Sequence, residues 1–481
     1  MRHTIHGSAR GIDAVSVVID DLSRPAHLSA SADFFPQGRD VLVTRAPGTL
    51  RLFGGAADTA GARALHVATA EGTLVALQRD PQGLLTIIRR TPGYRGRADI
   101  FEMPMHFLLS DGRPVRYDVA RHYFARHDDR AWAAPFAAAF LAMMRDRHVR
   151  FAEGVRVLIA AAAPRGHGRG ADAAAVIALL RGLFAEMNLV ADPRELTTLA
   201  AHADRGVHGP IDGIADHWPA TSAESEHVLA FTCQPQPDLA QVPWPTHLAV
   251  FGLDVGASLG VDLADTRQHD VRVAMAMAAR LLATQAPTAG ATGGVPDAGW
   301  HGALANLGPE AFAASHRASL PETMRGRDFL DRAAPNDDEQ RMVSPDTVYR
   351  VRAAASYGIY EHARARAFES FLPMPGDQET FDFLGDMLFE AHDSARACGL
   401  SFDAADAVVD GVRRVGRARG LLGARLGGGG TTVVILARAD AREAVLEVQR
   451  TVGERLGAVP LLIEGWSMGA VPFGYVRLRT L

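Results

Sequence analysis

The sequence predicts an α+β protein with two lobes, on three observations. Its 481 residues are 48% hydrophobic, which is enough for two or three substantial cores. Apolar residues alternate from 41 to about 90, which predicts a strand-rich region. Mixed helix and strand patterns follow, interrupted by a stretch rich in Ala, Gly, Pro and Thr. The expected ranges are an N-terminal segment 1–40, an N-terminal lobe 41–220, a connecting region 221–344 with a flexible stretch 284–300, and a C-terminal lobe 345–481.

Local patterns predict the elements in order. A Pro-Gly turn at 47–48 is expected to lead into an alternating strand that ends at Gly54 and Gly55. A heavily apolar helix is expected within 118–150, and residues 335–340 are expected to form an exposed loop. The remaining elements are a strand at 155–160, a long apolar helix from Asp172, a strand at 431–436, a helix at 439–457 and a last strand near 473–481.

Charge and composition exclude several classes of protein. A net charge of −5 gives no basic surplus for a phosphate backbone, so nucleic acid is not an expected partner. No apolar run is long enough for a signal peptide or a membrane span, so a cytoplasmic protein is expected. With only Cys233 and Cys398, a disulfide framework or a cysteine zinc site is not expected. The sequence contains no lysine, which excludes a Walker-type phosphate loop and Schiff-base chemistry.

Two glycines and a carboxylate form the first candidate site. Gly54 and Gly55 allow another group to approach the backbone closely, and Asp58 follows three residues after Gly55. The residues alone leave two interpretations open, a tight turn at a strand end or a loop that faces a ligand.

A glycine-rich stretch, PRGHGRGAD at 164–172, lies between a predicted strand and a predicted helix. Backbone N–H groups and a helix N-terminus form an anion site there, so the stretch is predicted to bind phosphates. The residues assigned to phosphate binding are Pro164, Gly166, Gly168, Arg169, Gly170 and Ala171. The spacing of Gly166, Gly168 and Ala171 also fits a dinucleotide fingerprint, and a plain turn is the third interpretation.

Acids and histidines gather at 202–218, HADRGVHGPIDGIADHW. Asp204 is expected at the end of a helix, and Asp216 lies twelve residues further on. The three histidines His202, His208 and His217 lack the spacing of a zinc-binding helix. A carboxylate that acts as a base or as a Mg²⁺ ligand fits the stretch better.

Four consecutive glycines, Gly427–Gly430, precede a predicted strand. Ordering them costs conformational entropy, so either another backbone approaches them closely or they form a flexible hairpin.

In this order, the motifs resemble those of the GHMP sugar kinases, and within them the plant L-arabinokinases and galactokinase. The resemblance runs from about residue 41 to the C-terminus. It implies a two-lobed fold, with an N-terminal lobe like that of a small-subunit ribosomal protein and a ferredoxin-like C-terminal lobe. It also implies transfer of phosphate from ATP, with Mg²⁺, to the anomeric hydroxyl of a sugar. The stretches that carry it are VTRAPGTLRLFGGAADTAG, AAAAPRGHGRGADAAAV, HGPIDGIADHW, VLAFTCQP, FGLDVG, AHDSARACGL, GARLGGGGTTVV and PLLIEGWSMGAVPFGYVRLR.

The resemblance implies roles for single residues. Asp216 matches the catalytic aspartate, Asp204 an acid that precedes it, and Asp58 a sugar-contacting aspartate. Gly54 and Gly55 would line the sugar pocket. Further substrate contacts are expected from Gly428 and Gly429, and the 164–171 residues would hold ATP.

Two positions depart from the family pattern. Thr49 replaces an arginine beside the transferred phosphate, and such an arginine can be worth roughly 10³-fold in rate. Asp172 replaces a hydroxyl that would hold Mg²⁺. A carboxylate about 4 Å from a phosphate oxygen, without a metal, would cost about 4 kcal/mol at an effective dielectric of about 20. Arg51, on the same strand face as Thr49, and Arg169 in the phosphate loop are expected to compensate, while Asp172 and Asp204 hold the metal.

The sequence thus predicts an ATP-dependent sugar 1-kinase that acts on a sugar-like substrate. Two alternatives stay open: a degenerate GHMP-fold protein that binds a sugar or a nucleotide without transfer, and a kinase-derived enzyme with altered chemistry in specialised biosynthesis. The sequence does not indicate an oligomeric state.

Overall fold

The structure is a computed structural model, and the residues that it describes form two compact units. Described are residues 2–6, 34–90, 98–126, 128–160, 170–208, 214–234, 238–256, 261–285, 300, 302–333, 337–427 and 430–479. Unit 1 comprises Met1–Thr49, Ala68–Ser225 and Trp466–Leu481, and unit 2 comprises Leu50–Val67 and Glu226–Gly465. The four consecutive ranges expected from the sequence remain a prediction.

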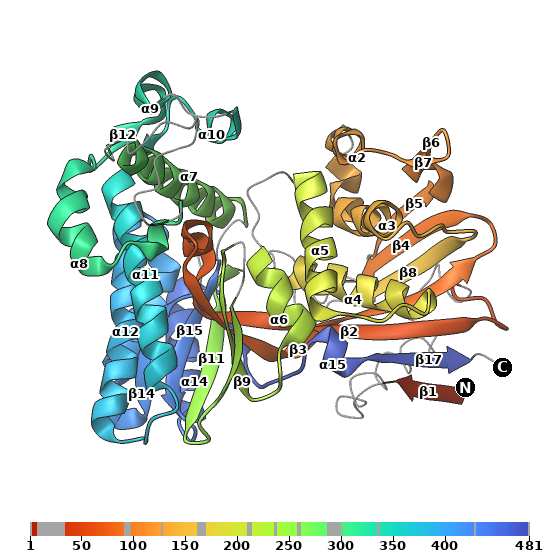
Figure 1. The fold of residues 1–481 in the computed structure, drawn as a ribbon. Helices are drawn as coiled ribbons and strands as arrows, with labels where there is room; N and C mark the ends of the chain where they lie inside the picture. The colour runs from red at the N-terminus through yellow and green to blue at the C-terminus, as the bar shows by residue number, and fades with distance from the viewer. Residues whose placement is uncertain are drawn as a thin grey trace. The chain divides into compact units, whose positions relative to one another are not determined.

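Unit 1 contains a mixed sheet in the order β1-β17-β2-β3-β8-β4-β5 (Figure 1). β4 and β8 pair in parallel, whereas β1 and β17, β17 and β2, β3 and β8, and β4 and β5 pair antiparallel. The strands are β1 (Arg2–His6), β2 (Asp40–Phe53), β3 (Arg63–Asp80), β4 (Leu84–Arg90), β5 (Asp99–Pro104), β8 (Gly154–Ala160) and β17 (Tyr475–Arg479), with a small hairpin of β6 (Leu109–Ser110) and β7 (Arg113–Pro114). β2 and β3 contribute residues to both units.

Apolar helices supply the core of unit 1. Phe136 and Phe140 of α3 and Leu180 and Phe184 of α4 are fully buried in one cluster with Ile87 of β4. α4 is apolar nearly all round, as a helix enclosed by other elements must be. The helices of this unit are α2 (Tyr117–Ala125), α3 (Ala134–Asp146), α4 (Gly170–Glu186), α5 (Pro193–His208), α6 (His217–Ser222) and α15 (Ala470–Phe473).

Unit 2 contains an antiparallel sheet in the order β14-β15-β11-β16. Long helices α11 and α12 run side by side in this unit (Figure 1). The strands are β9 (His227–Thr232), β10 (Leu239–Pro243), β11 (Leu248–Asp254), β12 (Met324–Arg325), β13 (Val348–Tyr349), β14 (Leu421–Leu426), β15 (Thr432–Arg438) and β16 (Leu461–Ile463). The helices are α7 (Val261–Gln285), α8 (Pro309–Ala311), α9 (Gly326–Arg332), α10 (Asp337–Met342), α11 (Val351–Phe371), α12 (Gln378–Cys398), α13 (Asp403–Val415) and α14 (Arg442–Leu456). Within the described ranges, no helix combines the length and the apolar character needed to cross a membrane.

Most of the elements predicted locally are confirmed, but the turn at Pro47 and Gly48 is wrong. β2 continues through both residues from Asp40 to Phe53. A Cβ atom on Gly48 would lie 2.8 Å from Thr69 Oγ1, so the glycine admits a close neighbour instead of making a turn.

The exposed loop predicted at 335–340 is also wrong from Asp337 onward, because α10 begins there. Arg341 in its last turn matches the helix macrodipole, a signal that the sequence carries. Residues 334–336, and 286–299 of the predicted flexible stretch, lie outside the described residues.

Candidate functional site

The backbone conformation of the first motif requires its two glycines. Gly54 and Gly55 have φ values of 111° and 83°, in the region that side chains disfavour. A Cβ on Gly54 would lie 2.7 Å from Asp58 Oδ1. The Gly55 N–H donates a hydrogen bond of 3.0 Å to the same oxygen, so the half-buried Asp58 closes a tight loop. Turn geometry therefore explains both glycines, and their contact with a sugar stays a prediction.

The segment that contains this loop packs against the apolar core of unit 2. A 3₁₀ helix, Gly55–Ala60, presents Ala56, Ala57 and Ala60 to the main apolar cluster of the unit. It packs against α7 and α11. Small side chains let the turn lie close to both helices, so the Asp58 carboxylate projects from a firm support.

The strand and the helix predicted on either side of the second motif are confirmed, whereas residues 161–169 between them lie outside the described residues. β8 ends at Ala160 and α4 begins at Gly170, as a strand, a loop and a helix were predicted there. Gly170 and Ala171 open the helix. The predicted phosphate residues Pro164, Gly166, Gly168 and Arg169, and the predicted sugar residues Gly428 and Gly429, lie outside the described residues. Their roles stay predictions.

Asp172 lies in the first turn of α4 beside a cation that the sequence did not reveal. Its side chain is 60% exposed, and its Oδ1 lies 3.5 Å from Arg89 Nη1. Arg89 is buried, contacts Asp99 at 3.5 Å and lies over the ring of Trp132. Burial lowers the pKa of Arg89, and the charge of Asp172 opposes this shift. The carboxylate that would repel a phosphate is thus partly neutralised by an arginine of β4, distant in sequence.

Two predicted acids lie near one buried histidine in unit 1. Asp204 is on α5, as expected, and its Oδ2 lies 3.9 Å from His217 Nε2, too far for a direct hydrogen bond. Asp216 precedes α6 and its side chain makes no capping hydrogen bond there. Burial lowers the pKa of His217 although both acids oppose the shift, so the imidazole is neutral at pH 7. His217 adds no positive charge that would compete for these carboxylates.

Thr49 and Arg51 lie on β2 as the sequence predicts. Both are partly buried, while Leu50 and Leu52 are buried, so residues 49 and 51 alternate with the core positions. Thr49 Oγ1 is buried and has no hydrogen-bond partner among the described residues. Compensation by Arg51 for the arginine missing at position 49 stays a prediction.

The donors present fit a Mg²⁺ ion in kind and number. Mg²⁺ is held in proteins by one or two carboxylates together with substrate phosphates. Asp172 and Asp204 supply two carboxylates from α4 and α5, which pack against each other. Within the described ranges, no three His, Cys, Asp or Glu side chains are placed to hold a metal ion by themselves.

Comparison with known proteins shows which family this chain resembles. Residues 135–224, which include Asp172, Asp204 and Asp216, match the GHMP kinases N terminal domain. This part of the chain is therefore similar to the N-terminal domain of the GHMP kinases. The chain is also 30% identical over 499 aligned residues to L-arabinokinase of Arabidopsis thaliana, with 94% of this chain and 48% of that protein covered. The chain therefore spans about half the length of this curated relative, and the predicted resemblance to the GHMP family is confirmed.

Solved structures show the same fold at low sequence identity. Lactococcus lactis galactokinase, in complex with galactose, is 15% identical to this chain and matches it with a TM-score of 0.67. The match covers 95% of this chain and 99% of the galactokinase chain. L. major mevalonate kinase, in complex with R-mevalonate, is 16% identical with a TM-score of 0.52 over 90% and 99% of the two chains. These matches confirm the predicted two-lobed α+β fold.

Proposed function

We propose that this GHMP-domain protein transfers the γ-phosphoryl group of ATP to the anomeric hydroxyl of an arabinose- or galactose-like sugar. The similarity to L-arabinokinase over 94% of the chain and the galactokinase fold support this reaction class. The observation that carries it is the placement of Asp216, half-buried at the start of α6 and not used as its cap. A carboxylate held there can accept a proton from a hydroxyl.

Asp216 is the base of the proposed reaction. It takes or polarises the proton of the anomeric hydroxyl as the sugar oxygen attacks the γ-phosphorus, and the bond to the ADP oxygen breaks. The neutral His217 beside it leaves the negative charge of Asp216 in place for this role. Positioning and charge stabilisation supply most of the rate in this class of reaction.

Asp172 and Asp204 are the proposed holders of Mg²⁺. A bound Mg²⁺ ion neutralises phosphate charge when ATP is present. Arg89 keeps Asp172 near the start of α4 through its 3.5 Å contact, and Asp172 is exposed enough to reach a second cation. This arrangement accounts for a carboxylate where the family has a hydroxyl.

The remaining roles follow the motifs. Arg51 and Arg169 supply the positive charge missing at Thr49. The phosphates of ATP bind the N-terminus of α4 and the preceding stretch, Pro164, Gly166, Gly168, Arg169, Gly170 and Ala171. The sugar contacts Gly54, Gly55, Asp58, Gly428 and Gly429.

One observation favours a second candidate, a protein that binds sugar or nucleotide without transfer. The position of the family's arginine holds Thr49, whose hydroxyl has no partner among the described residues and carries no charge. Loss of that arginine alone can lower a transfer rate roughly 10³-fold.

An ADP-release assay separates the two candidates. The protein is incubated with Mg²⁺-ATP and a panel of pentoses, hexoses and uronic acids, beside Asp216→Asn. The kinase proposal predicts turnover with at least one sugar and its loss in the variant. Nucleotide binding by calorimetry without turnover on any sugar would instead establish the binding protein.

A further inference from the structure

Gly54 of the first motif is held on both sides by one helix of unit 2. Its N–H donates a hydrogen bond of 3.0 Å to Glu361 Oε1, and its carbonyl accepts one of 3.3 Å from the hydroxyl of Tyr357. Tyr357 and Glu361 lie four residues apart on α11 and therefore share one helix face. Both polar groups of a single strained peptide position are thus fixed from the same surface.

A buried ion pair completes this arrangement. Arg425 Nη1 lies 2.5 Å from Glu361 Oε1, and the two side chains are 1% and 0% exposed. The Arg425 guanidinium lies 5.0 Å from the ring centroid of Phe53, the residue before Gly54. Burial lowers the pKa of Arg425, but Glu361 and Tyr357 more than reverse this shift, so the guanidinium stays charged. A buried pair of this kind is often replaceable by apolar residues without loss of stability, which points to a role in geometry.

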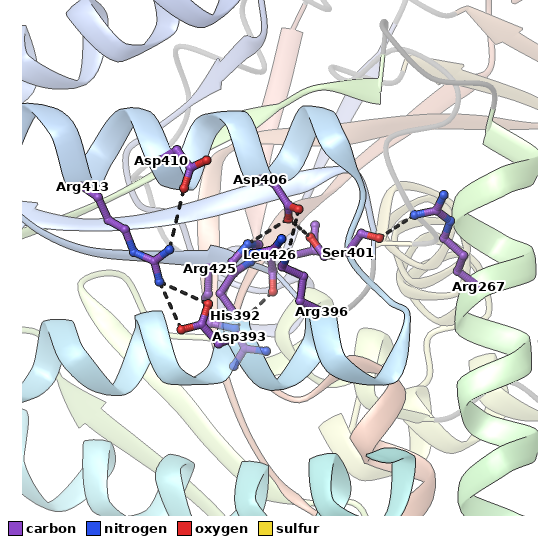
Figure 2. Close-up of polar contacts among 10 residues, drawn as sticks. All are labelled: Arg267, His392, Asp393, Arg396, Ser401, Asp406, Asp410, Arg413, Arg425 and Leu426. Carbon is purple, nitrogen blue, oxygen red and sulfur yellow. Dashed lines mark hydrogen bonds and ion pairs between the residues drawn. The ribbon is translucent and has the colours of Figure 1, made fainter. Parts of the chain in front are cut away.

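Arg425 also lies two residues before the glycine run, Gly427–Gly430. Arg425 Nε donates to the Leu426 carbonyl at 3.1 Å, and the Leu426 N–H donates to His392 Nδ1 at 3.2 Å. His392 Nε2 lies 3.1 Å from Asp406 Oδ1, and Figure 2 shows this chain of contacts from Arg425 toward α13. A Cβ on the next residue, Gly427, would lie 3.1 Å from the Arg51 carbonyl. The end of β14 is therefore fixed close to the strand that carries the first motif.

We propose that Glu361, Tyr357 and Arg425 are positioning residues that set the Gly54–Asp58 loop relative to the start of the glycine run, and so set the affinity for the sugar. This inference rests on the proposed function, which assigns the loop and the glycines to the sugar. Glu361 and Tyr357 form hydrogen bonds with the loop backbone at Gly54. They determine where the Asp58 carboxylate lies because Asp58 is hydrogen-bonded to Gly55, the next residue.

Two variants test this role without leaving a buried charge unpaired. Tyr357→Phe removes one hydroxyl, and the double variant Glu361→Met with Arg425→Met replaces the ion pair by apolar side chains. Each is expected to raise KM for the sugar about tenfold while kcat and KM for ATP change less than about twofold. Glu369→Gln is the matched control, because Glu369 lies on the same helix as Glu361 but pairs with Arg63 of β3 at 2.6 Å. The N–H groups of Gly54 and Gly55 donate to Glu361 and Asp58 instead.

Hydrogen exchange provides a readout that does not depend on catalysis. Backbone amides of residues 54–58 are expected to exchange at least about tenfold faster in Tyr357→Phe than in the wild type, with little change in the control. If the wild-type protein phosphorylates no sugar, the proposed function falls, and this exchange result alone decides whether the loop is positioned by α11. Unchanged exchange in the loop together with an unchanged sugar KM, in folded variants, would overturn the inference.

Discussion

Acidic side chains are held in opposite ways in the two units. Glu361 in unit 2 is fully buried 2.5 Å from Arg425, whereas Asp172 in unit 1 is 60% exposed and 3.5 Å from Arg89. Exposed pairs contribute roughly 0–1 kcal/mol, while breaking a buried pair costs about 3–5 kcal/mol. The loop of the first motif is therefore fixed by the fold, and the acid of the second motif can exchange partners. Asp172, the expected departure from the family pattern, therefore lies where exchanging Arg89 for another cation costs little free energy.

The largest expected effect is on chemistry in unit 1. Asp216→Asn should lower kcat by about 10²–10⁴-fold, because an amide cannot accept the proton of the sugar hydroxyl. Its melting temperature should stay close to that of the wild type, since asparagine has nearly the same size and shape as aspartate. Steady-state kinetics and thermal unfolding check both statements, and an active Asn variant would remove Asp216 from the mechanism.

The complementary effect in unit 2 is on stability. Arg425→Met alone should lower the free energy of unfolding by about 3–5 kcal/mol, because it leaves the buried Glu361 carboxylate without its cation. Adding Glu361→Met should restore most of this loss. Urea unfolding of the two variants measures the difference, and equal stabilities would show that the pair is not strongly coupled.

An intermediate effect is expected at the exposed pair. If Asp172 holds Mg²⁺, Asp172→Asn should raise the Mg²⁺ concentration needed for half-maximal rate about tenfold, since one charged ligand is lost. If Asp172 serves only as the partner of Arg89, the Mg²⁺ dependence should be unchanged and ATP should bind as well or better. Titration of Mg²⁺ at fixed ATP, with Glu186→Gln as a control that breaks another ion pair of α4, distinguishes these outcomes.

The smallest effect concerns pH. Burial lowers the pKa of His392 although Asp406 and Asp393 oppose the shift. The His392 imidazole thus stays neutral in the folded state, whereas in the unfolded chain it binds a proton below the ordinary histidine pKa of about 6.5. The free energy of unfolding should therefore fall as pH decreases below about 6.5, with no such contribution above it. His392→Gln should reduce this decline by about 1 kcal/mol or less, measured by urea unfolding at pH 7.5 and 5.5. An unchanged slope would show that His392 is not responsible.

The sequence predicts those features that depend on local pattern. The long apolar run of α4, the strand β8 before it and the helix that carries Asp204 follow from local composition and spacing. The turn predicted at Pro47 and Gly48 was wrong because the local sequence is the same whether a glycine makes a turn or admits a close neighbour, here Thr69.

Contacts between residues far apart in sequence left no such signal. The pairing of Arg89 with Asp172 and of Glu361 with Arg425 depends on which strands and helices become neighbours. Nothing in the residues around Glu361 marks it as the acceptor for Gly54, so the support of the first motif appears only in three dimensions.

The most direct test of the central claim is to identify the product. L-Arabinose and D-galactose are incubated separately with the protein and Mg²⁺-ATP, and the reaction is followed by ³¹P nuclear magnetic resonance. A sugar kinase of this type predicts a new phosphate signal coupled to the anomeric proton, formed in step with ADP and absent for Asp216→Asn. Release of inorganic phosphate alone, or ATP that stays intact with both sugars while nucleotide binding is measurable, would contradict phosphorylation of the anomeric hydroxyl.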